Sequence, residues 1–523
     1  MNFGIYLQRA ARQWPDQPAV LYRDRRLSYR QLEERSNRLA HALRALGLKR
    51  GDRVAIVSPN RPEIVEYECA LYKLGLVKVA LNARLAPAEL QDALANAEPM
   101  AVAAAPTHRD MVRTATEGLP GLRHFIAFDA DAQTRADGWL DHEALLAAQP
   151  DTHVRETMQP DDLAVLHYTS GSTGRLKAAM QTVGNRHASL RKVIMGRMHA
   201  GPSDVLMLCG PITHASGMFI QPMLYQGATI LLMDRFVPAE ILAAIARHRV
   251  TMSFMVPAMI HALLAEPTRR EHDLSSLRLL SYGAAPMSPS RIREAWDLFG
   301  PVLAQGYGAG ETTGGVISLG IADHARAMSG ERPDLLLACG RPVCESEVEV
   351  LDDDGRPVLG DAIGEICVRG PDVFAGYWRA PELTREALGA DGWLRTGDLA
   401  RVDAEGYIFI VDRKKEMLVS GGFNVYPREV ETVLAQHPAV YEACVVGVPD
   451  DHWGEAVKAV VVLRQGARAT ADELMQFCDG RLAGFKRPRS VDFVTELPKN
   501  SNGKLSRKDV REPYWRGRER RVN

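Results

Sequence analysis

The chain has 523 residues, more than one hydrophobic core usually organises, so two or more domains are expected. Its 46% hydrophobic and 25% charged residues are typical of a globular protein, which argues against a disordered or fibrous chain. Lys and Arg together number 64 against 65 Asp and Glu, so the chain lacks the positive field that collects nucleic acid. We therefore expect no nucleic-acid partner.

The sequence also argues against export and against a membrane span. The first residues, MNFGIYLQRAARQWPD, contain no apolar stretch long enough for a signal peptide. The longest mainly apolar region, 241–265, is interrupted by Arg247, His248 and Arg249 and cannot supply about 20 uncharged residues. The seven cysteines show neither a CxxC pair nor zinc-ligand spacing. These features predict a cytoplasmic protein with reduced cysteines and no transmembrane segment.

Helical and strand patterns alternate along the first part of the chain. Ser28 and Gln31 fit a capping box, and leucines then recur at helical spacing until Gly47. The run 53–60, RVAIVSPN, is typical of a buried strand, and the same helix-then-strand order returns in 241–257. This alternation predicts an α/β fold with doubly wound, mainly parallel sheets covered by helices.

The pattern changes after residue 343. From there to 409, short strand patterns are broken by the run 352–355 and by later glycines, which predicts an antiparallel, barrel-like section that closes the large domain. After the charged run 412–416, two helical and two strand patterns predict a compact α+β unit. We expect an N-terminal domain over 1–412 and a small mobile domain over 413–523.

The most informative segment is TSGSTGRLK, which directly follows the apolar strand pattern LAVLHY. Glycines let backbone N–H groups approach phosphate oxygens, hydroxyls add donors, and a lysine supplies a point charge. The spacing does not fit G-x-x-x-x-G-K-[ST], so this is not an ordinary P-loop, and a flexible Gly/Ser connector is the structural alternative. The residues predicted to bind phosphate are Thr169, Ser170, Gly171, Ser172, Thr173, Gly174 and Lys177.

Two further segments have chemistry that suits Mg-ATP. In QGYGAGET, Tyr307 offers a flat apolar surface and Glu311 a hard oxygen ligand. In RTGDL, the carboxylate of Asp398 can only accept hydrogen bonds, which suits a ribose diol. A buried tyrosine, a capping glutamate and a turn aspartate are the ordinary structural alternatives.

Taken in order, these segments resemble the adenylate-forming superfamily of acyl-CoA synthetases, which also contains luciferases and peptide-synthetase adenylation domains. The resemblance runs from about Leu27 to Arg507. It implies an ATP-dependent acid–CoA ligase that forms an acyl-adenylate and pyrophosphate, then an acyl-CoA and AMP. ATP, Mg²⁺ and coenzyme A would be its cofactors, and a fatty or aromatic carboxylic acid its small-molecule partner.

The resemblance also implies roles for single residues. Lys504 in PKNSNGK would be the catalytic lysine, Glu311 the magnesium ligand, Lys415 the domain hinge and His214 a gate at the acyl site. Asp398 would accept bonds from both ribose hydroxyls. Four apolar residues near His214 favour a fatty or aromatic acid, with core packing as the structural alternative: Met218, Phe219, Met259 and Tyr282. The other residues that it places at nucleotide or coenzyme A are Gly283, Ala284, Ala285, Gln305, Gly306, Tyr307, Gly308, Thr312, Arg413, Gly421, Gly422 and Phe423.

The chain departs from the family pattern at three positions. Leu176 and Ala178 stand where Pro and Gly are common, and Gly310 stands where a threonine usually bonds phosphate, with Thr312 or Thr313 as replacement hydroxyls. Two alternative functions stay open: loading a carrier-protein thiol, and nucleotide binding without efficient catalysis. A homodimer is a further open expectation.

Overall fold

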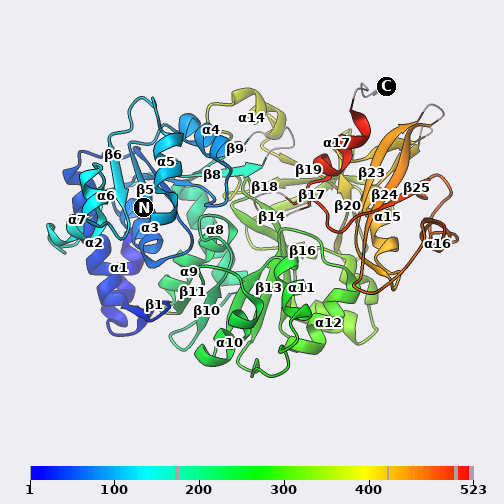
Figure 1. Cartoon of the computed structure of the whole chain (residues 1–523), viewed down its shortest axis with the longest axis horizontal. Coiled ribbons are helices and arrows are strands. Elements are labelled where there is room, and N and C mark those ends of the chain that lie inside the picture. Colours follow the sequence, from blue (N-terminus) through cyan, green and yellow to red (C-terminus); the bar gives the residue numbers. More distant parts are fainter. Residues whose placement is uncertain are drawn as a thin grey trace.

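The computed structural model describes residues 2–170, 176–196, 198–420, 423–450, 453–499 and 505–516. Its strands form four sheets, and helices cover the two largest (Figure 1). The predicted α/β class is confirmed. None of the described helices combines the length and hydropathy that a bilayer crossing requires.

The first sheet has seven strands and is parallel except at its last pair, β8 with β9. Alternate residues of its strands face opposite layers, because side chains in a strand alternate. On β3, Val54 and Ile56 pack toward α2 and α3, whereas Ala55 and Val57 pack toward α4 and α5. In sheet order the strands are β7 (Leu140–Asp141), β6 (His124–Ala127), β5 (Ala101–Ala104), β3 (Arg53–Val57), β4 (Val77–Ala80), β8 (Leu163–Ser170) and β9 (Leu176–Thr182).

The second sheet has nine strands, with a parallel centre and antiparallel edges. Helices α10, α11 and α12 cover one of its faces around a core that includes Ile241, Ile260 and Ile292. In sheet order the strands are β16 (Arg341–Pro342), β15 (Gly314–Leu319), β14 (Leu303–Ala309), β13 (Leu279–Gly283), β12 (Met252–Met255), β10 (Val205–Leu208), β11 (Thr229–Leu232), β1 (Pro18–Tyr22) and β2 (Arg25–Ser28).

The helices of the large domain mostly begin at proline or at a capping side chain. They are α1 (Gly4–Gln13), α2 (Tyr29–Ala45), α3 (Pro62–Leu74), α4 (Pro87–Ala97), α5 (Arg109–Ala115), α6 (Ala132–Ala136), α7 (His142–Ala147), α8 (Val183–Gly196), α9 (Ile220–Tyr225), α10 (Pro238–His248), α11 (Pro257–Ala265), α12 (Pro289–Phe299), α13 (Ile321–Met328) and α14 (Pro381–Ala387). Short 3-10 turns are η1 (Pro106–His108), η2 (Ala215–Phe219) and η3 (Pro333–Leu337).

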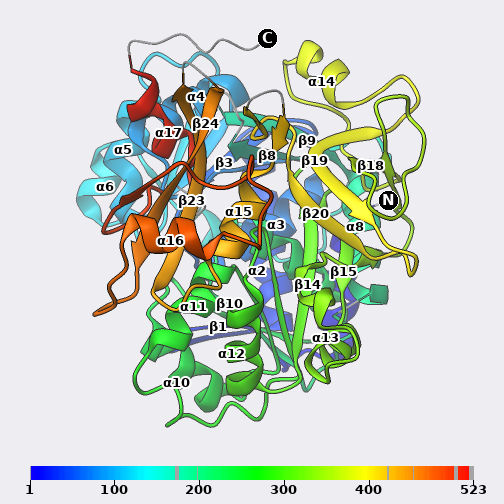
Figure 2. The ribbon, with the colours of Figure 1, turned by 90° about the vertical axis from the view of Figure 1, so that its right-hand side faces the viewer.

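The third sheet corresponds to the section predicted from short strands. It is antiparallel and contains β17 (Glu347–Leu351), β18 (Gly364–Arg369), β19 (Leu394–Val402) and β20 (Ile408–Arg413). Figure 2 shows these strands beside the C-terminal unit. The sheet ends at Arg413, one residue after the expected domain boundary.

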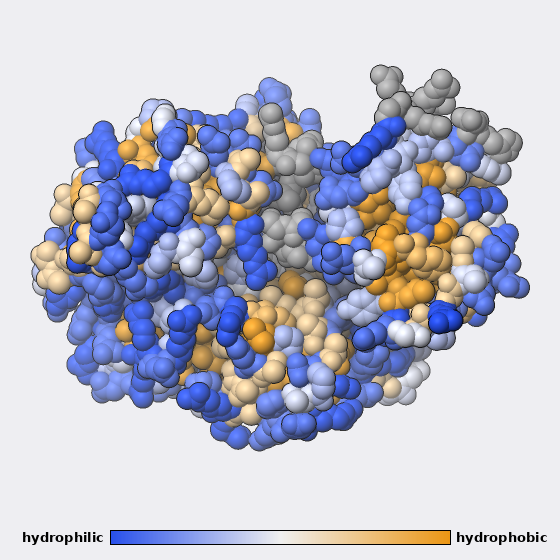
Figure 3. Space-filling view, viewed as in Figure 1, coloured by the Kyte–Doolittle hydropathy of each residue, from blue (hydrophilic) through white to orange (hydrophobic). Residues whose placement is uncertain are grey.

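The fourth sheet belongs to the C-terminal unit, which has the predicted α+β composition. Its strands are β22 (Phe423–Val425), β21 (Leu418–Ser420), β24 (Gly454–Leu463), β23 (Val440–Asp450) and β25 (Ser490–Phe493), and its helices are α15 (Pro427–Leu434), α16 (Ala471–Phe477) and α17 (Arg507–Trp515). The Arg291 guanidinium of α12 lies 5.7 Å from the ring of Tyr441 on β23, so the unit contacts the second sheet's helices. Apolar side chains gather on its surface over β23 and α15 (Figure 3).

Several local predictions are confirmed. Ser28 caps α2 through the expected capping box with Gln31. The run 241–257 forms most of α10 and then β12, as its pattern indicates. The seven cysteines form no disulfides in the structure; six of them are buried, and Cys344 is exposed.

Candidate active site

The predicted phosphate loop joins two neighbouring strands. Thr169 at the end of β8 pairs across the sheet with Lys177 on β9, so the loop leaves and returns at one edge. Gly171, Ser172, Thr173 and Gly174 lie outside the described residues, and Ser170 is described only by its backbone. Their assignment to phosphate stays a prediction. Thr169 and Lys177, which flank the loop, are paired across the two strands that it joins.

Glu311 and Lys177 are linked by a tyrosine that the sequence analysis missed. The hydroxyl of Tyr377 donates to Glu311 Oε1 at 2.8 Å, and the Lys177 ammonium lies 5.2 Å from the centre of the Tyr377 ring. Burial and the Glu311 charge raise the pKa of Tyr377 well above its usual value, which keeps the phenol protonated as a donor. A cation, a phenol and a carboxylate therefore meet beside the predicted phosphate loop.

The backbone explains why Tyr377 lies there. The Tyr377 backbone forms an antiparallel bridge with Ala179 on β9, and Trp378 N–H donates to the carbonyl of Ala178. Phe374 N–H donates to the carbonyl of Glu311 at 2.8 Å. The segment 374–378 thus runs between β9 and the segment that contains Glu311. Its only pattern signal is Gly376, whose φ of 116° marks a turn before the tyrosine.

The hydroxyls next to Glu311 are engaged or enclosed. Thr312 Oγ1 accepts from the N–H of Ala309 and donates to the carbonyl of Gly314 at 2.7 Å. Thr313 has no exposed surface, and its φ of 44° marks a strained turn. The structure therefore uses Thr312 within the turn 309–314, and its predicted contact with the nucleotide stays a prediction.

The glycines and alanines assigned to the nucleotide lie at the carboxyl ends of two parallel strands. Gly283 on β13 pairs with Gly306 on β14, and a Cβ on Gly283 would lie 2.2 Å from the Gly306 carbonyl oxygen. Ala284 follows with φ of 66°, a left-handed conformation that alanine rarely adopts. Carboxyl ends of parallel strands are where open α/β sheets bind ligands. Gln305 and Gly308 lie on the same β14, and Ala285 follows Ala284 in the turn.

Three residues assigned to nucleoside come together in the structure. Tyr307 donates its hydroxyl to Asp398 Oδ2 at 2.6 Å, and Arg413 Nε donates to Asp398 Oδ1 at 3.2 Å. Asp398 and Arg413 also pair directly between β19 and β20. Burial, followed by the Asp398 charge, raises the pKa of Tyr307 well above its usual value. The carboxylate that would hold a ribose is thus oriented by a phenol and a guanidinium.

The segment around His214 gathers residues from three elements. The His214 ring lies 5.3 Å, centre to centre, from the His167 ring on β8. A Cβ on Gly314 would lie 3.2 Å from Met218 Sδ and 3.7 Å from Ser189 Oγ, so η2, α8 and the start of β15 meet here. The predicted position of His214 at an acyl site stays a prediction.

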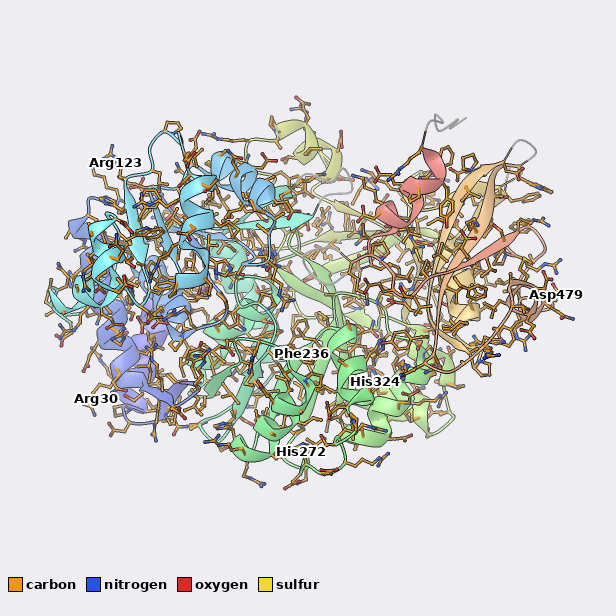
Figure 4. All side chains as sticks on the ribbon, in the orientation of Figure 1. Arg30, Arg123, Phe236, His272, His324 and Asp479 are labelled. Atoms are coloured by element: carbon orange, nitrogen blue, oxygen red, sulfur yellow. The ribbon has the colours of Figure 1, made fainter. Side chains whose placement is uncertain are left out.

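Two apolar side chains were expected near His214 together with Met218 and Phe219. Met259 does approach this segment, because a Cβ on Gly210 would lie 3.8 Å from Met259 Cε and 2.7 Å from Ser216 Oγ. Tyr282 does not, since it has no exposed surface and its hydroxyl bonds His324 Nε2 at 2.9 Å. His324, labelled in Figure 4, belongs to α13. Tyr282 is a core residue, as the core-packing alternative expects.

The C-terminal site residues are only partly described. Lys504, Gly421 and Gly422 lie outside the described residues, but Lys499 and Leu505 form an antiparallel bridge on either side of the segment that contains Lys504. Phe423 is 54% exposed on β22 and stacks on Phe485 at 4.7 Å between ring centres. These assignments stay predictions.

A magnesium site in this place would depend on substrate oxygens. Among the described residues, no three His, Cys, Asp or Glu side chains come together as a metal cage. Mg²⁺ is usually held by one or two carboxylates with phosphates and water. Glu311, a half-buried carboxylate whose second oxygen carries no described hydrogen bond, fits that arrangement.

Family models match most of the chain. The model described as AMP-binding enzyme matches residues 7–378, and the model described as AMP-binding enzyme C-terminal domain matches residues 429–504. The intervening segment contains β19, β20 and the expected domain boundary. Both the adenylate-binding part and the C-terminal unit are therefore present in the expected order.

Similar proteins with reported functions align along nearly their whole length. A feruloyl-CoA synthase of Amycolatopsis is 39% identical over 98% of this chain and 99% of its own. A medium/long-chain fatty-acid–CoA ligase of Mycobacterium tuberculosis is 35% identical over 99% of this chain and 91% of its own.

Solved structures agree with these matches. An amide bond synthetase from Marinactinospora thermotolerans superposes with a TM-score of 0.89 at 32% identity, covering 98% of this chain and 99% of its own. The o-succinylbenzoate coenzyme A synthetase from Bacillus subtilis, in complex with ATP and magnesium ion, gives 0.82 at 29% identity, covering 97% and 98%. The chain belongs to the AMP-binding enzyme family, within the adenylate-forming superfamily of acyl-CoA synthetases.

Proposed function

We propose that this protein joins a hydroxylated aromatic carboxylic acid to coenzyme A, using ATP and Mg²⁺. Two groups of side chains carry the ligase chemistry. In the first, Tyr307 and Arg413 donate hydrogen bonds to Asp398. In the second, Tyr377 donates to Glu311 and its ring lies beside the Lys177 ammonium. The first group suits a ribose and the second suits charged phosphates with a metal ion. The relatives that are named CoA synthases or ligases support the overall reaction.

The reaction has two steps. A carboxylate oxygen attacks the α-phosphorus of ATP and pyrophosphate leaves, giving a mixed anhydride. The coenzyme A thiolate then attacks the acyl carbon and AMP leaves. Negative charge develops on phosphoryl oxygens in the first step, so the cations Lys177 and Lys504 would stabilise it, and Mg²⁺ at Glu311 would neutralise phosphate charge.

The second half-reaction requires the small C-terminal domain to move. We divide the chain after residue 412, because β20, the last strand of the third sheet, ends at Arg413 and the next strand belongs to the C-terminal unit. Rotation about Lys415 would withdraw Lys504 after adenylation and bring the segment around Phe423 to the acyl-adenylate. Hinge motion over a short segment between packed units is an ordinary way to alternate two sites. The cytoplasmic location and the homodimer stay predictions.

The acid class rests on two buried hydroxyls. Ser189 and Ser216 are each 3% exposed and lie beside the segment around His214: Ser216 is two residues beyond His214, and Ser189 Oγ would lie 3.7 Å from a Cβ on Gly314. A buried hydroxyl left beside an alkyl chain is unfavourable, whereas a polar substituent on an aromatic ring would pair with it. The feruloyl-CoA synthase relative supports this choice over a fatty acid.

The test is thioester formation from a set of acids that differ in one feature at a time. With ATP, Mg²⁺ and coenzyme A, we expect 4-hydroxycinnamate to give a kcat/KM at least tenfold above cinnamate and above octanoate or palmitate. Ser189→Ala and Ser216→Ala should reduce the preference for the hydroxylated acid and leave cinnamate turnover largely unchanged. A higher kcat/KM with the fatty acids would refute the aromatic class. Acyl transfer only to an amine, giving an amide, or only to a carrier-protein thiol would refute coenzyme A as the acceptor.

A further inference from the structure

Gly310 lies directly before Glu311 and leaves no room for a side chain. A Cβ built on it would lie 2.7 Å from Cδ2 of His167 and 2.9 Å from Cγ2 of Thr169, both closer than real Cβ contacts. Its φ is not in the left-handed region, so the backbone conformation does not require glycine. The space is taken by neighbouring side chains, and the closest is an imidazole.

His167 points to Gly310 because of its position on β8. Side chains two residues apart in a strand share a face, so His167 lies on the same face as Thr169, the first residue of the predicted phosphate loop. Its partners on the adjacent strands are Ala80 and Ala179, two small residues that leave space for the ring. The side chain is nearly buried at 9% exposure.

The surroundings of His167 join three parts of the candidate site. Its ring meets the His214 ring at 5.3 Å in an edge-to-face arrangement. Its Nε2 would lie 3.5 Å from a Cβ on Gly310, next to the carboxylate that we assign to magnesium. His167 therefore lies between the expected acyl group and the expected phosphates, where the carboxylate and the α-phosphorus must meet.

The neighbouring hydroxyls do not fill this place. Thr312 uses its hydroxyl inside the turn 309–314, and Thr313 Oγ1 is enclosed without exposed surface. An imidazole N–H is a donor in both the neutral and the protonated form, so it can replace a hydroxyl donor beside Glu311.

We propose that the His167 imidazole donates a hydrogen bond to a phosphoryl oxygen of the bound nucleotide, in the position that a side chain at residue 310 would otherwise occupy. Gly310 is required so that this imidazole can reach the phosphoryl group. The inference rests on the proposed adenylation, and it assigns a binding residue without adding a proton-transfer step.

The test is a cycle of two substitutions, His167→Ala and Gly310→Thr, with their combination. AMP and adenosine binding are measured by calorimetry, because their difference isolates the phosphoryl contact. His167→Ala should weaken AMP by about 10- to 100-fold, the usual effect of losing a hydrogen bond to a charged group, and leave adenosine unchanged. Gly310→Thr alone should also weaken AMP, since the threonine and the imidazole collide.

The double variant gives the sharpest outcome. It places a hydroxyl in the space vacated by the imidazole, so we expect it to recover at least tenfold in AMP affinity and in ATP–pyrophosphate exchange over either single variant. His167→Gln, which keeps an N–H donor, should lose less than His167→Ala and serves if the alanine variant does not fold.

Three results would overturn the assignment. The first is an unchanged AMP affinity in His167→Ala and His167→Gln. The second is an equal loss of affinity for AMP and for adenosine. The third is a double variant that binds AMP no more tightly than the single variants. Failure of the proposed function is distinguishable from failure of the His167 assignment. A wild-type protein that binds AMP but forms no thioester with any acid would refute the ligase proposal, and its AMP affinity would still test His167. A wild-type protein that binds no AMP would refute both.

Discussion

Removing the hydroxyl of Tyr377 tests whether this residue orients Glu311 for metal binding. Tyr377→Phe deletes the 2.8 Å hydrogen bond to Glu311 Oε1 and keeps the ring beside Lys177. A hydrogen bond to a charged acceptor contributes about 1.5–3 kcal/mol. If that energy holds the carboxylate in its metal-binding orientation, the Mg²⁺ concentration at half-maximal ATP–pyrophosphate exchange should rise about 10- to 100-fold.

A second substitution separates the ring from the hydroxyl. Tyr377→Leu removes both, so the Lys177 ammonium also loses a cation–π contact of about 0.5–2 kcal/mol. We expect the leucine variant to show the same Mg²⁺ shift as the phenylalanine variant, together with a further rise in the KM for ATP. The two effects are read from separate titrations of Mg²⁺ and ATP.

Tyr168→Phe is the matched control. It also deletes a tyrosine hydroxyl, which bonds the carbonyl of Ala93 at 2.9 Å and Asn96 Oδ1 at 2.7 Å, away from Glu311. This control should lower the melting temperature and leave the Mg²⁺ dependence unchanged. An unchanged Mg²⁺ dependence in Tyr377→Phe, or the same shift in Tyr168→Phe, would refute the role of Tyr377.

Three other predictions concern the C-terminal unit and its junction. Lys504→Ala should abolish adenylation and leave thioester formation from preformed acyl-adenylate largely intact; equal loss of both half-reactions would contradict its assignment. Lys415→Pro should instead keep adenylation and slow thioester formation, so that acyl-adenylate accumulates in a single-turnover assay. Unchanged thioester turnover would count against the hinge. Burial raises the pKa of Asp412 from 3.8 to about 6, so the folded protein keeps a proton that the unfolded chain releases. Its stability should therefore fall by up to about 3 kcal/mol as the pH rises from 4 to 6. Urea unfolding should show that this fall in the free energy of unfolding with pH is absent in Asp412→Asn. An equal pH dependence in the wild-type protein and the variant would contradict the assignment to Asp412.

The sequence predicts those parts of the fold that are set by local patterns. The capping box at Ser28, the helix-then-strand order of 241–257 and the strand before the phosphate loop all depend on residues a few positions apart. The antiparallel section and the α+β unit are also recognisable, because glycines and charged runs separate their strands. Local chemistry is sufficient for these elements.

Contacts between distant segments were not predictable in the same way. Tyr307 and Asp398 are 91 residues apart, and the sequence shows what each could bind but not that one donates to the other. Tyr377 lies in an irregular segment, so no periodic pattern marks it. His167 could have been found from strand alternation, since it shares a face with Thr169, but its contact with Gly310 depends on the packing of two sheets.

Tyr282 shows the reverse case. Its apolar ring left both an acyl contact and core packing open, and β13 directs the ring into the core of the second sheet. Tyr282 and Gly283 are neighbours within β13 and so face opposite sides of the sheet. Closeness in sequence to a ligand segment therefore does not place a side chain in the site.

The most direct test of the central claim is AMP and thioester formation by the purified protein with 4-hydroxycinnamate, ATP, Mg²⁺ and coenzyme A. We predict that AMP, pyrophosphate and the thioester appear in equal amounts, and that omitting coenzyme A leaves acid-dependent ATP–pyrophosphate exchange. Formation of ADP and phosphate, or the absence of acid-dependent exchange across aromatic and fatty acids, would contradict the account.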